Sequence, residues 1–402
     1  MRALSLRRFA EPLSGLAGSL GATLSTSFGV RATGASPIAI DLGSSGIKLL
    51  QLDLSDAASP TLIAAACLET PEALRADHGR RLLWQIEQLP RLIREGGFKG
   101  KRAVCSIPAS QTYCKHAQLA RAEGGELEQA VRAMLGSQLS CDPSLLVHRQ
   151  VEVPVVAPGG KMEVICMATS RELVQKLMAG LKAAKVELVG VHSEFHATLR
   201  AFETVARRAD DKGVPTLYLD VGSSTTKAMI THGKDMVFAR LIETGGNALD
   251  AAVGAQLKLE GAEARTTRLE LEALHTKGTK PIGEQGEAGV GAGAENQAEG
   301  MTRVDLSEPL EMLTDELCMC LRYHETLFPG KKVERAVFTG GEARHKGLCQ
   351  HIARSIRLPA QVADPMARIT RSGKEPAMGL DLRAPQPGWA VALGLCLSPT
   401  DL

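Results

Sequence analysis

Two short stretches of the chain carry the same polar residues at the same spacing. Residues 38–54 read IAIDLGSSGIKLLQLDL, and residues 216–231 read TLYLDVGSSTTKAMIT. In each copy an apolar run ends near an aspartate, a Gly-Ser-Ser turn follows, and a lysine lies in the apolar run that comes next. The matching positions are Asp41 and Asp220, Gly43 and Gly222, Ser44 and Ser223, Ser45 and Ser224, and Lys48 and Lys227.

This pattern predicts a glycine hairpin that binds phosphate. Glycine adopts backbone torsions closed to other residues and lets main-chain N–H groups approach a ligand. A tight hairpin aims successive N–H donors at one point, which suits phosphate oxygens. A carboxylate beside a phosphate needs a cation between them, so Asp41 and Asp220 predict Mg²⁺, held through its water ligands. A duplication whose two hairpins are purely architectural is the alternative interpretation.

The duplication predicts two lobes that place one hairpin on each side of a single triphosphate. A third motif, AVFTGGEARHKGL at residues 336–348, reads as a strand that ends in Gly340 and Gly341 and is followed by a helix. A flat ring such as adenine could lie against that backbone, although an ordinary strand-to-helix turn has the same pattern. Gly394, in the apolar run WAVALGLCL, predicts close helix packing and a hinge between the lobes.

Composition bounds the class of protein. The 402 residues suffice for two compact lobes. Acidic and basic residues nearly cancel, 45 against 47, and there are only three Tyr and two Trp. This balance argues against a nucleic-acid partner, which needs clustered cations and stacking rings. Nine scattered cysteines without a CxxC pair fit free thiols in the reducing cytoplasm. No apolar run approaches the ~20 residues of a membrane-spanning helix.

Alternating strand and helix patterns predict an α/β fold with mixed sheets. RAVCSIP, EVICMATS, TLYLDVG and ERAVFTGG read as strands, and RELVQKLMAGLKAAKV, EPLEMLTDELCMCLRYHETLF and KGLCQHIARSI read as helices. The predicted organisation is a disordered or weakly amphipathic tail (1–36), a first lobe (37–111 and 169–213) interrupted by an inserted subdomain (112–168), a second lobe (214–384) with a disordered Gly-rich loop (276–300), and a C-terminal helix packed on the first lobe (385–402).

These motifs, in this order, resemble the actin-like ATPase superfamily, and within it the PilM family of cytoplasmic type IV pilus assembly proteins. DLGSSGIK and DVGSSTTK resemble the family's phosphate hairpins, ETGGNALDAAVGAQL its GGN segment, AEARTTRLE its AE-x-x-K helix, and RAVFTGGEARHKG its adenosine turn. The resemblance runs from about residue 37 to 400. It implies an actin-like, ribonuclease H-like α/β fold of two lobes with duplicated mixed sheets, flanking helices and a small α+β subdomain inserted in the first lobe, as in FtsA and PilM.

The resemblance also implies roles for individual residues. Glu263 would reach the ribose, whereas the family's lysine three positions later is replaced by Thr266, beside Arg265, which puts adenosine affinity in question. The residues implied to hold ATP phosphates are Gly43, Ser44, Ser45 and Lys48 from one side and Gly222, Ser223, Ser224 and Thr225 from the other, with Gly340 and Gly341 at the adenosine.

Asp220 and Glu194 are the candidate catalytic residues. Glu194 matches an acidic family position that faces the nucleotide and could orient a hydrolytic water as a weak general base. His192 and His196 flank it at i, i+4 spacing, which invites a zinc interpretation. The metalloprotease helix needs His-Glu-x-x-His, however, and this glutamate is out of place, so structural histidines are the favoured reading.

The function implied is an ATP-binding, at most slowly hydrolysing, scaffold of a type IV pilus or related secretion machine. It would bind the N-terminal tail of an inner-membrane PilN-like protein in a groove beside the inserted subdomain. Self-association and peripheral membrane contact through the N-terminal tail are left open. The alternatives are a small-molecule kinase on the same fold, an FtsA-like filament or division protein, and a nucleotide-free adaptor, which Thr266 favours.

Overall fold

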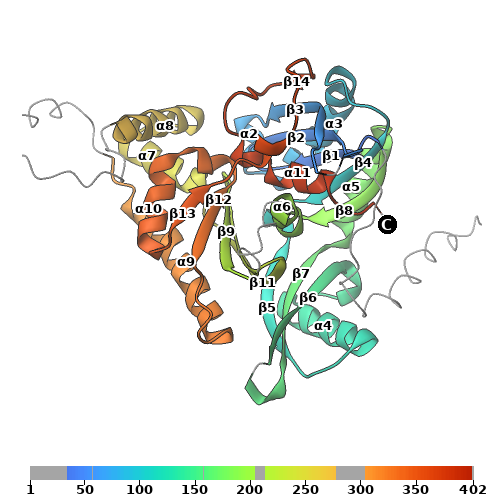
Figure 1. The fold of residues 1–402 in the computed structure, drawn as a ribbon, viewed down its shortest axis with the longest axis vertical. Coiled ribbons are helices and arrows are strands. Elements are labelled where there is room, and N and C mark those ends of the chain that lie inside the picture. Colours follow the sequence, from blue (N-terminus) through green and yellow to red (C-terminus); the bar gives the residue numbers. More distant parts are fainter. Residues whose placement is uncertain (1–33, 57, 157, 204–212, 278–303, 401–402) are drawn as a thin grey trace, which may run out of the picture.

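Two large mixed sheets, a smaller third sheet and the helices around them form the described part of this computed structural model (Figure 1). The α/β class predicted from the sequence is confirmed. Most of the predicted tail (1–36) and Gly-rich loop (276–300) lies outside the described residues. The structure describes residues 34–56, 58–156, 158–203, 213–277 and 304–400.

The first sheet has six strands in the order β14-β3-β2-β1-β4-β8. All five residues of β1 are buried, because both faces of the sheet are covered. Ile38 and Ile40 pack with residues of α3 and α5, whereas Ala39 packs with residues of α11. The strands are β1 (Ile38–Leu42), β2 (Gly46–Asp53), β3 (Thr61–Glu69), β4 (Arg102–Ile107), β8 (Glu187–Ser193) and β14 (Ala377–Met378).

The second sheet has five strands in the order β11-β10-β9-β12-β13 and repeats the antiparallel hairpin of the first. Strand β12, which precedes the predicted adenosine turn, lies directly beside β9 in parallel. Both larger sheets therefore begin with an antiparallel hairpin whose first strand also has a parallel neighbour. The strands are β9 (Pro215–Val221), β10 (Thr226–His232), β11 (Asp235–Ile242), β12 (Arg335–Thr339) and β13 (Ala360–Val362).

A separate three-stranded antiparallel sheet, β5-β7-β6, carries α4 (Gly124–Leu139) and lies at the lower end of the molecule (Figure 1). Leu127, Val131 and Leu135 of α4 pack on this sheet. Strands β6 and β7 pair in antiparallel register. The strands are β5 (Tyr113–Leu119), β6 (Leu146–Val156) and β7 (Met162–Ser170). In contrast, β14 falls inside the range predicted for the second lobe, yet it pairs with β3 of the first sheet.

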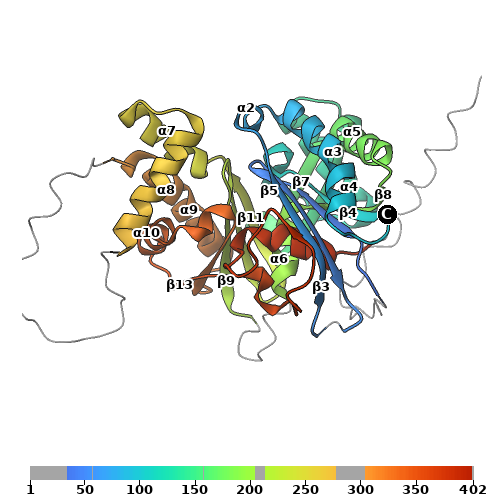
Figure 2. The same cartoon turned by 90° about the horizontal axis from the view of Figure 1, so that it is seen from above.

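The helices cover the outer faces of the sheets, and two of them lie between the lobes. Figures 1 and 2 show α6 and α11 between the two large sheets. Phe195 of α6 packs with the second lobe, whereas Ala197 and Ala201 of the same helix pack with α11. The other helices are α2 (Glu72–Arg75), α3 (His78–Glu95), α5 (Arg171–Ala183), α7 (Gly246–Leu257), α8 (Gly261–Lys277), α9 (Ser307–Leu327) and α10 (Lys346–Ile356), besides α6 (Glu194–Glu203) and α11 (Ala390–Cys396).

The predicted regular elements are found where the sequence places them. The four predicted strands correspond to β4, β7, β9 and β12, and the three predicted helices correspond to α5, α9 and α10. Within the described residues, no helix combines the length and the apolarity that crossing a bilayer requires.

Gly394 of α11 allows the backbones of α11 and α6 to touch. A Cβ at this position would overlap the carbonyl oxygen of Ala197. We expect Gly394→Ala to push the two helices apart and to destabilise the fold by at least about 2 kcal/mol, seen as a lower midpoint of thermal unfolding. Gly347→Ala in α10 is the matched control, because nothing lies within 4 Å of its Cβ position. Equal midpoints for the two variants would contradict this account of the interface.

Candidate functional site

The tips of the two duplicated hairpins meet across the lobes. The hydroxyl oxygens of Ser44, between β1 and β2, and Ser224, between β9 and β10, lie 2.6 Å apart in a hydrogen bond. The structure thus brings together the two motifs that the sequence predicted to face each other, although 180 residues separate them. Backbone and hydroxyl donors of both tips are half-buried and converge on one place.

The first tip is fixed by residues outside the motif. The buried side chain of Gln85, on α3, donates to the carbonyl of Gly43 at 2.8 Å and to the hydroxyl of Thr70 at 3.2 Å. The backbone N–H of Thr70 in turn donates to the carbonyl of Ser45 at 2.9 Å. The carbonyl groups of Gly43 and Ser45 are thus satisfied by residues outside the tip.

The second tip is held by the N-terminus of α7. The backbone N–H of Gly246 donates to the carbonyl of Gly222 at 3.1 Å, and that of Asn247 to the carbonyl of Ser223 at 2.7 Å. A Cβ on Gly245 would overlap the carbonyl of Gly222. Gly245 of ETGGNALD is therefore required by close backbone approach, and unpaired N–H groups of a helix start find partners in this hairpin.

In each hairpin the lysine lies directly opposite the aspartate on the paired strand. Asp41 pairs in register with Lys48, and their Oδ2 and Nζ atoms are 3.6 Å apart. Asp41 is 3% exposed. Burial raises the pKa of the Asp41 carboxyl to about 6, against the opposing effect of the Lys48 ammonium. Asp41 is thus a buried acid whose ionisation depends on its neighbours.

The second hairpin makes a tighter cluster. Asp220 pairs in register with Lys227, with 2.8 Å between Oδ2 and Nζ. The same ammonium donates to the carboxylate of Glu194, at the start of α6, and the hydroxyl of Thr198 donates to Asp220 at 3.3 Å. Burial alone would lower the pKa of Lys227, but the two carboxylates outweigh it and raise the pKa above its usual value. The two carboxylates therefore favour the charged form of this ammonium.

These contacts do not suit the predicted magnesium site. Mg²⁺ requires near-octahedral oxygen ligands and carries its own waters. The Oδ2 atom of Asp220 is already occupied by Lys227 and Thr198, and Asp41 has Lys48 beside it. In the part of the chain that is described, no group of three or more His, Cys, Asp or Glu side chains is arranged to hold a metal.

The turn after β12 lies against the second hairpin. Gly340 has φ +95°, and a Cβ there would overlap the carbonyl of Val221 and lie 2.5 Å from Oδ1 of Asp220. Gly341 is close to Gly388: a Cβ on Gly388 would lie 3.3 Å from the Cα and N atoms of Gly341. The two glycines predicted to bind adenosine are thus joined to Asp220 by backbone packing, which only glycine permits at position 340.

A buried ionic triad lies beside this turn. Arg268 of α8 is fully buried, and its guanidinium binds Oδ1 of Asp250 at 2.6 Å and Oε2 of Glu342 at 2.9 Å. Burial raises the pKa of Asp250, while Arg268 acts in the opposite direction. A Cβ on Gly246 would overlap the Glu342 carboxylate, so the triad reaches the start of α7. Sequence reasoning missed it, because its members come from α7, α8 and the β12 turn with no local motif.

Glu263 and Thr266 lie on the first turns of α8 and are both exposed. The hydroxyl of Thr266 donates to the carbonyl of Ala262, one turn back. Gly261, at the start of α8, comes close to Glu72 of α2 in the first lobe, with 3.2 Å between its Cβ position and the Cγ atom. The role of Glu263 toward a ribose stays a prediction.

The two histidines around Glu194 have hydrogen-bond partners. The Nε2 atom of His192 lies 3.0 Å from the carbonyl of Pro399, and the Nδ1 atom of His196 lies 2.8 Å from the hydroxyl of Ser193. Burial, together with nearby Arg200, lowers the pKa of both rings to about 4. Neutral rings held in this way contribute to packing between α6 and the C-terminal segment.

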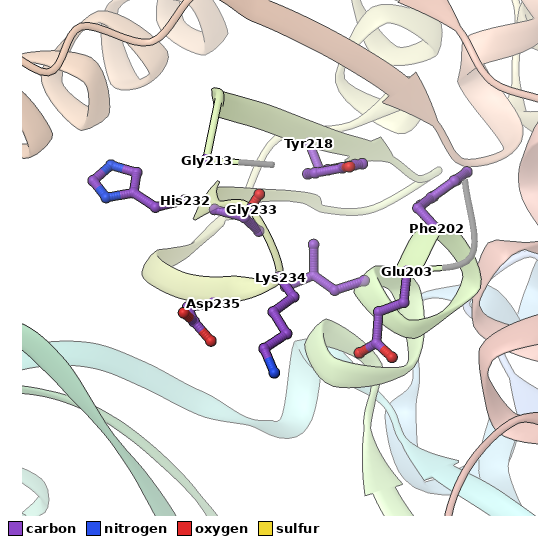
Figure 3. A pocket seen from close by; sticks show the side chains of 10 residues that line it. Phe202, Glu203, Gly213, Tyr218, His232, Gly233, Lys234 and Asp235 are labelled. Carbon is purple, nitrogen blue, oxygen red and sulfur yellow. The ribbon is translucent and has the colours of Figure 1, made fainter. Parts of the chain in front are cut away.

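A cavity of about 480 Å³ lies away from the hairpin tips (Figure 3). Phe202 of α6 and Tyr218 of β9 stack along it, with ring centroids 5.5 Å apart. Glu203 and Gly213 also line it, and they border a stretch, 204–212, that the structure does not describe. The cavity is therefore assigned no ligand. Its lining residues are Leu199, Phe202, Glu203, Gly213, Tyr218, Thr231, His232, Gly233, Lys234 and Asp235.

A model of one protein family, described as type IV pilus assembly protein PilM, matches residues 39–274, which is more than half of the chain. The chain belongs to the PilM family. This confirms the resemblance found in the sequence motifs. No curated protein matches the chain.

Solved structures show the fold. One solved structure is described as a PilM-PilN type IV pilus biogenesis complex, and its matching chain is 19% identical to this one. The TM-score is 0.69, and the match covers 91% of this chain and 98% of that chain. The chain thus has the actin-like fold of the PilM family, as predicted. A weaker match is the ethanolamine utilization protein EutJ from Carboxydothermus hydrogenoformans, with 15% identity, a TM-score of 0.47, and coverage of 90% of this chain and 89% of that one. Another is ADP-bound MreB5 of Spiroplasma citri, with 13% identity, a TM-score of 0.45, and coverage of 90% of this chain and 95% of that one.

Removing the cation of the triad tests how strongly it stabilises the region around the turn after β12. Arg268→Met leaves the half-buried Asp250 and the buried Glu342 without their arginine, and we expect a loss of about 3–5 kcal/mol in stability. Arg132→Met is the control, since Arg132 pairs with Glu128 on the exposed face of α4 and such pairs contribute only about 0.3–0.5 kcal/mol. Denaturant unfolding measures both, and an equal effect would refute a structural role for the triad.

Proposed function

We propose that the chain is an ATP-binding actin-like scaffold of a type IV pilus or related secretion machine, and that it binds the N-terminal tail of an inner-membrane PilN-like protein. Family membership supports the assignment to pilus assembly. The observation that carries nucleotide binding is the meeting of two glycine hairpins from opposite lobes. A phosphate chain entering between Ser44 and Ser224 would replace the hydroxyl contact with contacts to both tips. This parting of the tips couples binding to the relative position of the lobes.

The residues proposed to bind the phosphates are those of the two tips: Gly43, Ser44 and Ser45, with Lys48, and Gly222, Ser223, Ser224 and Thr225. Lys48 is the more exposed of the two hairpin lysines, with 20% of its side chain accessible, and is therefore available to an anionic ligand. Gly340, Gly341 and Glu263 are proposed to contact the adenosine.

Hydrolysis, where it occurs, is proposed to be slow. A water-activating base needs a free carboxylate oxygen aimed at the water. The carboxylates of both candidate catalytic residues, Glu194 and Asp220, bind the ammonium of Lys227 instead. The same engagement disfavours a small-molecule kinase, which needs a free acid to accept a substrate proton. A scaffold whose nucleotide state sets lobe position requires neither. The proposed location is cytoplasmic, at the inner membrane through its partner.

The proposed partner site is the exposed apolar surface beside the inserted sheet. Leu145 and Val147, at the start of β6, are 59% and 37% exposed, and Met178 of α5 is 47% exposed. Arg171 of α5 donates to the carbonyls of Ser144 and Leu146 at 2.8 and 3.2 Å, which fixes the helix against that edge. Exposed apolar side chains on two adjoining elements suit a short amphipathic tail. The match to a solved structure described as a PilM-PilN complex supports a PilN-like protein as the partner.

ATP binding is tested by isothermal titration calorimetry on the full chain. We expect association with the unmodified protein and at least about tenfold weaker binding by Ser44→Asp, because a carboxylate at the tip repels phosphate. Ser355→Asp, at an exposed position of α10, serves as the control and should bind like the unmodified chain. No heat with any of the three proteins would reject ATP binding and leave the nucleotide-free adaptor as the function.

Tail binding is tested with a synthetic peptide of the N-terminal cytoplasmic segment of a PilN-like inner-membrane protein. Fluorescence anisotropy should show binding that Leu145→Ser and Met178→Ser each weaken by about 1–2 kcal/mol, the transfer cost of one apolar side chain. Met312→Ser on α9 is the matched control, because Met312 is 58% exposed but lies on the other lobe. A loss caused by Met312→Ser alone would move the partner site to the second lobe.

A further inference from the structure

The two hairpin lysines occupy different environments although their sequence positions match. The Nζ atom of Lys48 lies 3.6 Å from Asp41, and the side chain is 20% exposed. The Nζ atom of Lys227 lies 2.8 Å from Asp220, is bound by Glu194 as well, and its side chain is only 8% exposed. The ammonium of Lys48 is thus partly accessible, whereas that of Lys227 is held between two carboxylates.

Lys227 lies between two carboxylates, one of which, Asp220, is predicted from the sequence to hold Mg²⁺. Glu194 comes from α6 and Asp220 from β9, so the ammonium links the inter-lobe helix to the second sheet. The Oδ2 atom of Asp220 accepts from Lys227 and Thr198, and Oδ1 lies against the backbone of Gly340. Direct coordination of both carboxylates by a magnesium ion, with ligands at about 2.0–2.1 Å in octahedral geometry, would require displacement of the lysine.

The ammonium of Lys227 also supplies the positive charge that binding an anion near these carboxylates requires. A buried carboxylate near phosphate oxygens repels them unless a positive charge compensates it, and the repulsion is large where water is excluded. Here Asp220 of the second hairpin and Glu194 of α6 are bound to one ammonium. The half-buried donors of both tips and the accessible Lys48 remain for the ligand.

We propose that the ammonium of Lys227 takes the place of a divalent cation between Asp220 and Glu194, so that the cleft accepts a phosphate-bearing nucleotide without Mg²⁺. The statement about the nucleotide rests on the function proposed above, whereas the statement about the cation does not. Lys227 is in this sense a positioning and specificity residue that removes the metal requirement of the site.

The cation is tested first without nucleotide. Mn²⁺ is titrated into the full chain, and free Mn²⁺ is followed by electron paramagnetic resonance. We expect no specific binding by the unmodified chain, by Lys227→Arg, or by Lys182→Met, which removes an exposed lysine of α5. Lys227→Met should bind about one Mn²⁺, because its two carboxylates are then uncompensated. Specific Mn²⁺ binding by the unmodified chain that Asp220→Asn abolishes would overturn the proposal.

A separate measurement checks that the Lys227→Met variant folds. Lys227→Met leaves two buried acids unpaired, so its thermal midpoint is measured with and without Mg²⁺, beside that of the double variant Lys227→Met with Glu194→Gln. Mg²⁺ should raise the midpoint of Lys227→Met and leave that of the unmodified chain unchanged. A rise of equal size in the unmodified chain would contradict the proposal.

The nucleotide arm compares ATP titrations in excess EDTA and in excess Mg²⁺, using the unmodified chain. We expect dissociation constants that agree within about threefold. Weakening by tenfold or more in EDTA would show that the metal is needed, and would overturn this proposal while leaving ATP binding intact. Absence of binding in both conditions would instead reject ATP binding and the metal-free nucleotide site with it, while the Mn²⁺ titration would still decide the role of Lys227.

Discussion

The buried contact of one ammonium with two carboxylates organises the centre of this molecule. Lys227 joins Asp220 on the second sheet to Glu194 on the helix that lies between the lobes. Separating these charges in a buried environment would leave each without compensation, which is far more costly than separating an exposed pair. The position of α6, and through its packing that of α11 and the first sheet, is therefore tied to the second hairpin.

The duplicated hairpins share a backbone and differ in how they are supported. Side chains of α3 and the residue after β3 hold the first tip, whereas the N-terminus of α7 holds the second. In both hairpins, carbonyl groups of the tip accept hydrogen bonds from these supports, and the N–H of Gly222 donates to the carbonyl of Thr225 within its own hairpin. The two tips touch through the hydroxyl groups of Ser44 and Ser224.

A buried ionic triad orders the region around the turn after β12. A fully buried arginine bridges acids from α7 and from that turn, and the Glu342 carboxylate fills space beside Gly246. Thr266 is exposed on α8. This region therefore depends on its internal ion pairs for order.

The sequence by itself determined the α/β class, the strands and helices with strong periodic patterns, and the two glycine hairpins. It also indicated that the chain belongs to the PilM family. These features depend on local spacing, since apolar period and turn chemistry are encoded in neighbouring residues. The pairing of Lys227 with Glu194, the Arg268 triad, the place of β14 in the first sheet and the apolar surface around Leu145 were decided only by the tertiary structure. Each joins segments distant in sequence, and no local pattern records which buried charge will find which partner or which edge a short strand will join. The matching sequence positions of Lys48 and Lys227 could have suggested that each opposes an aspartate. Only the tertiary structure left Lys48 partly exposed and buried Lys227 between two carboxylates.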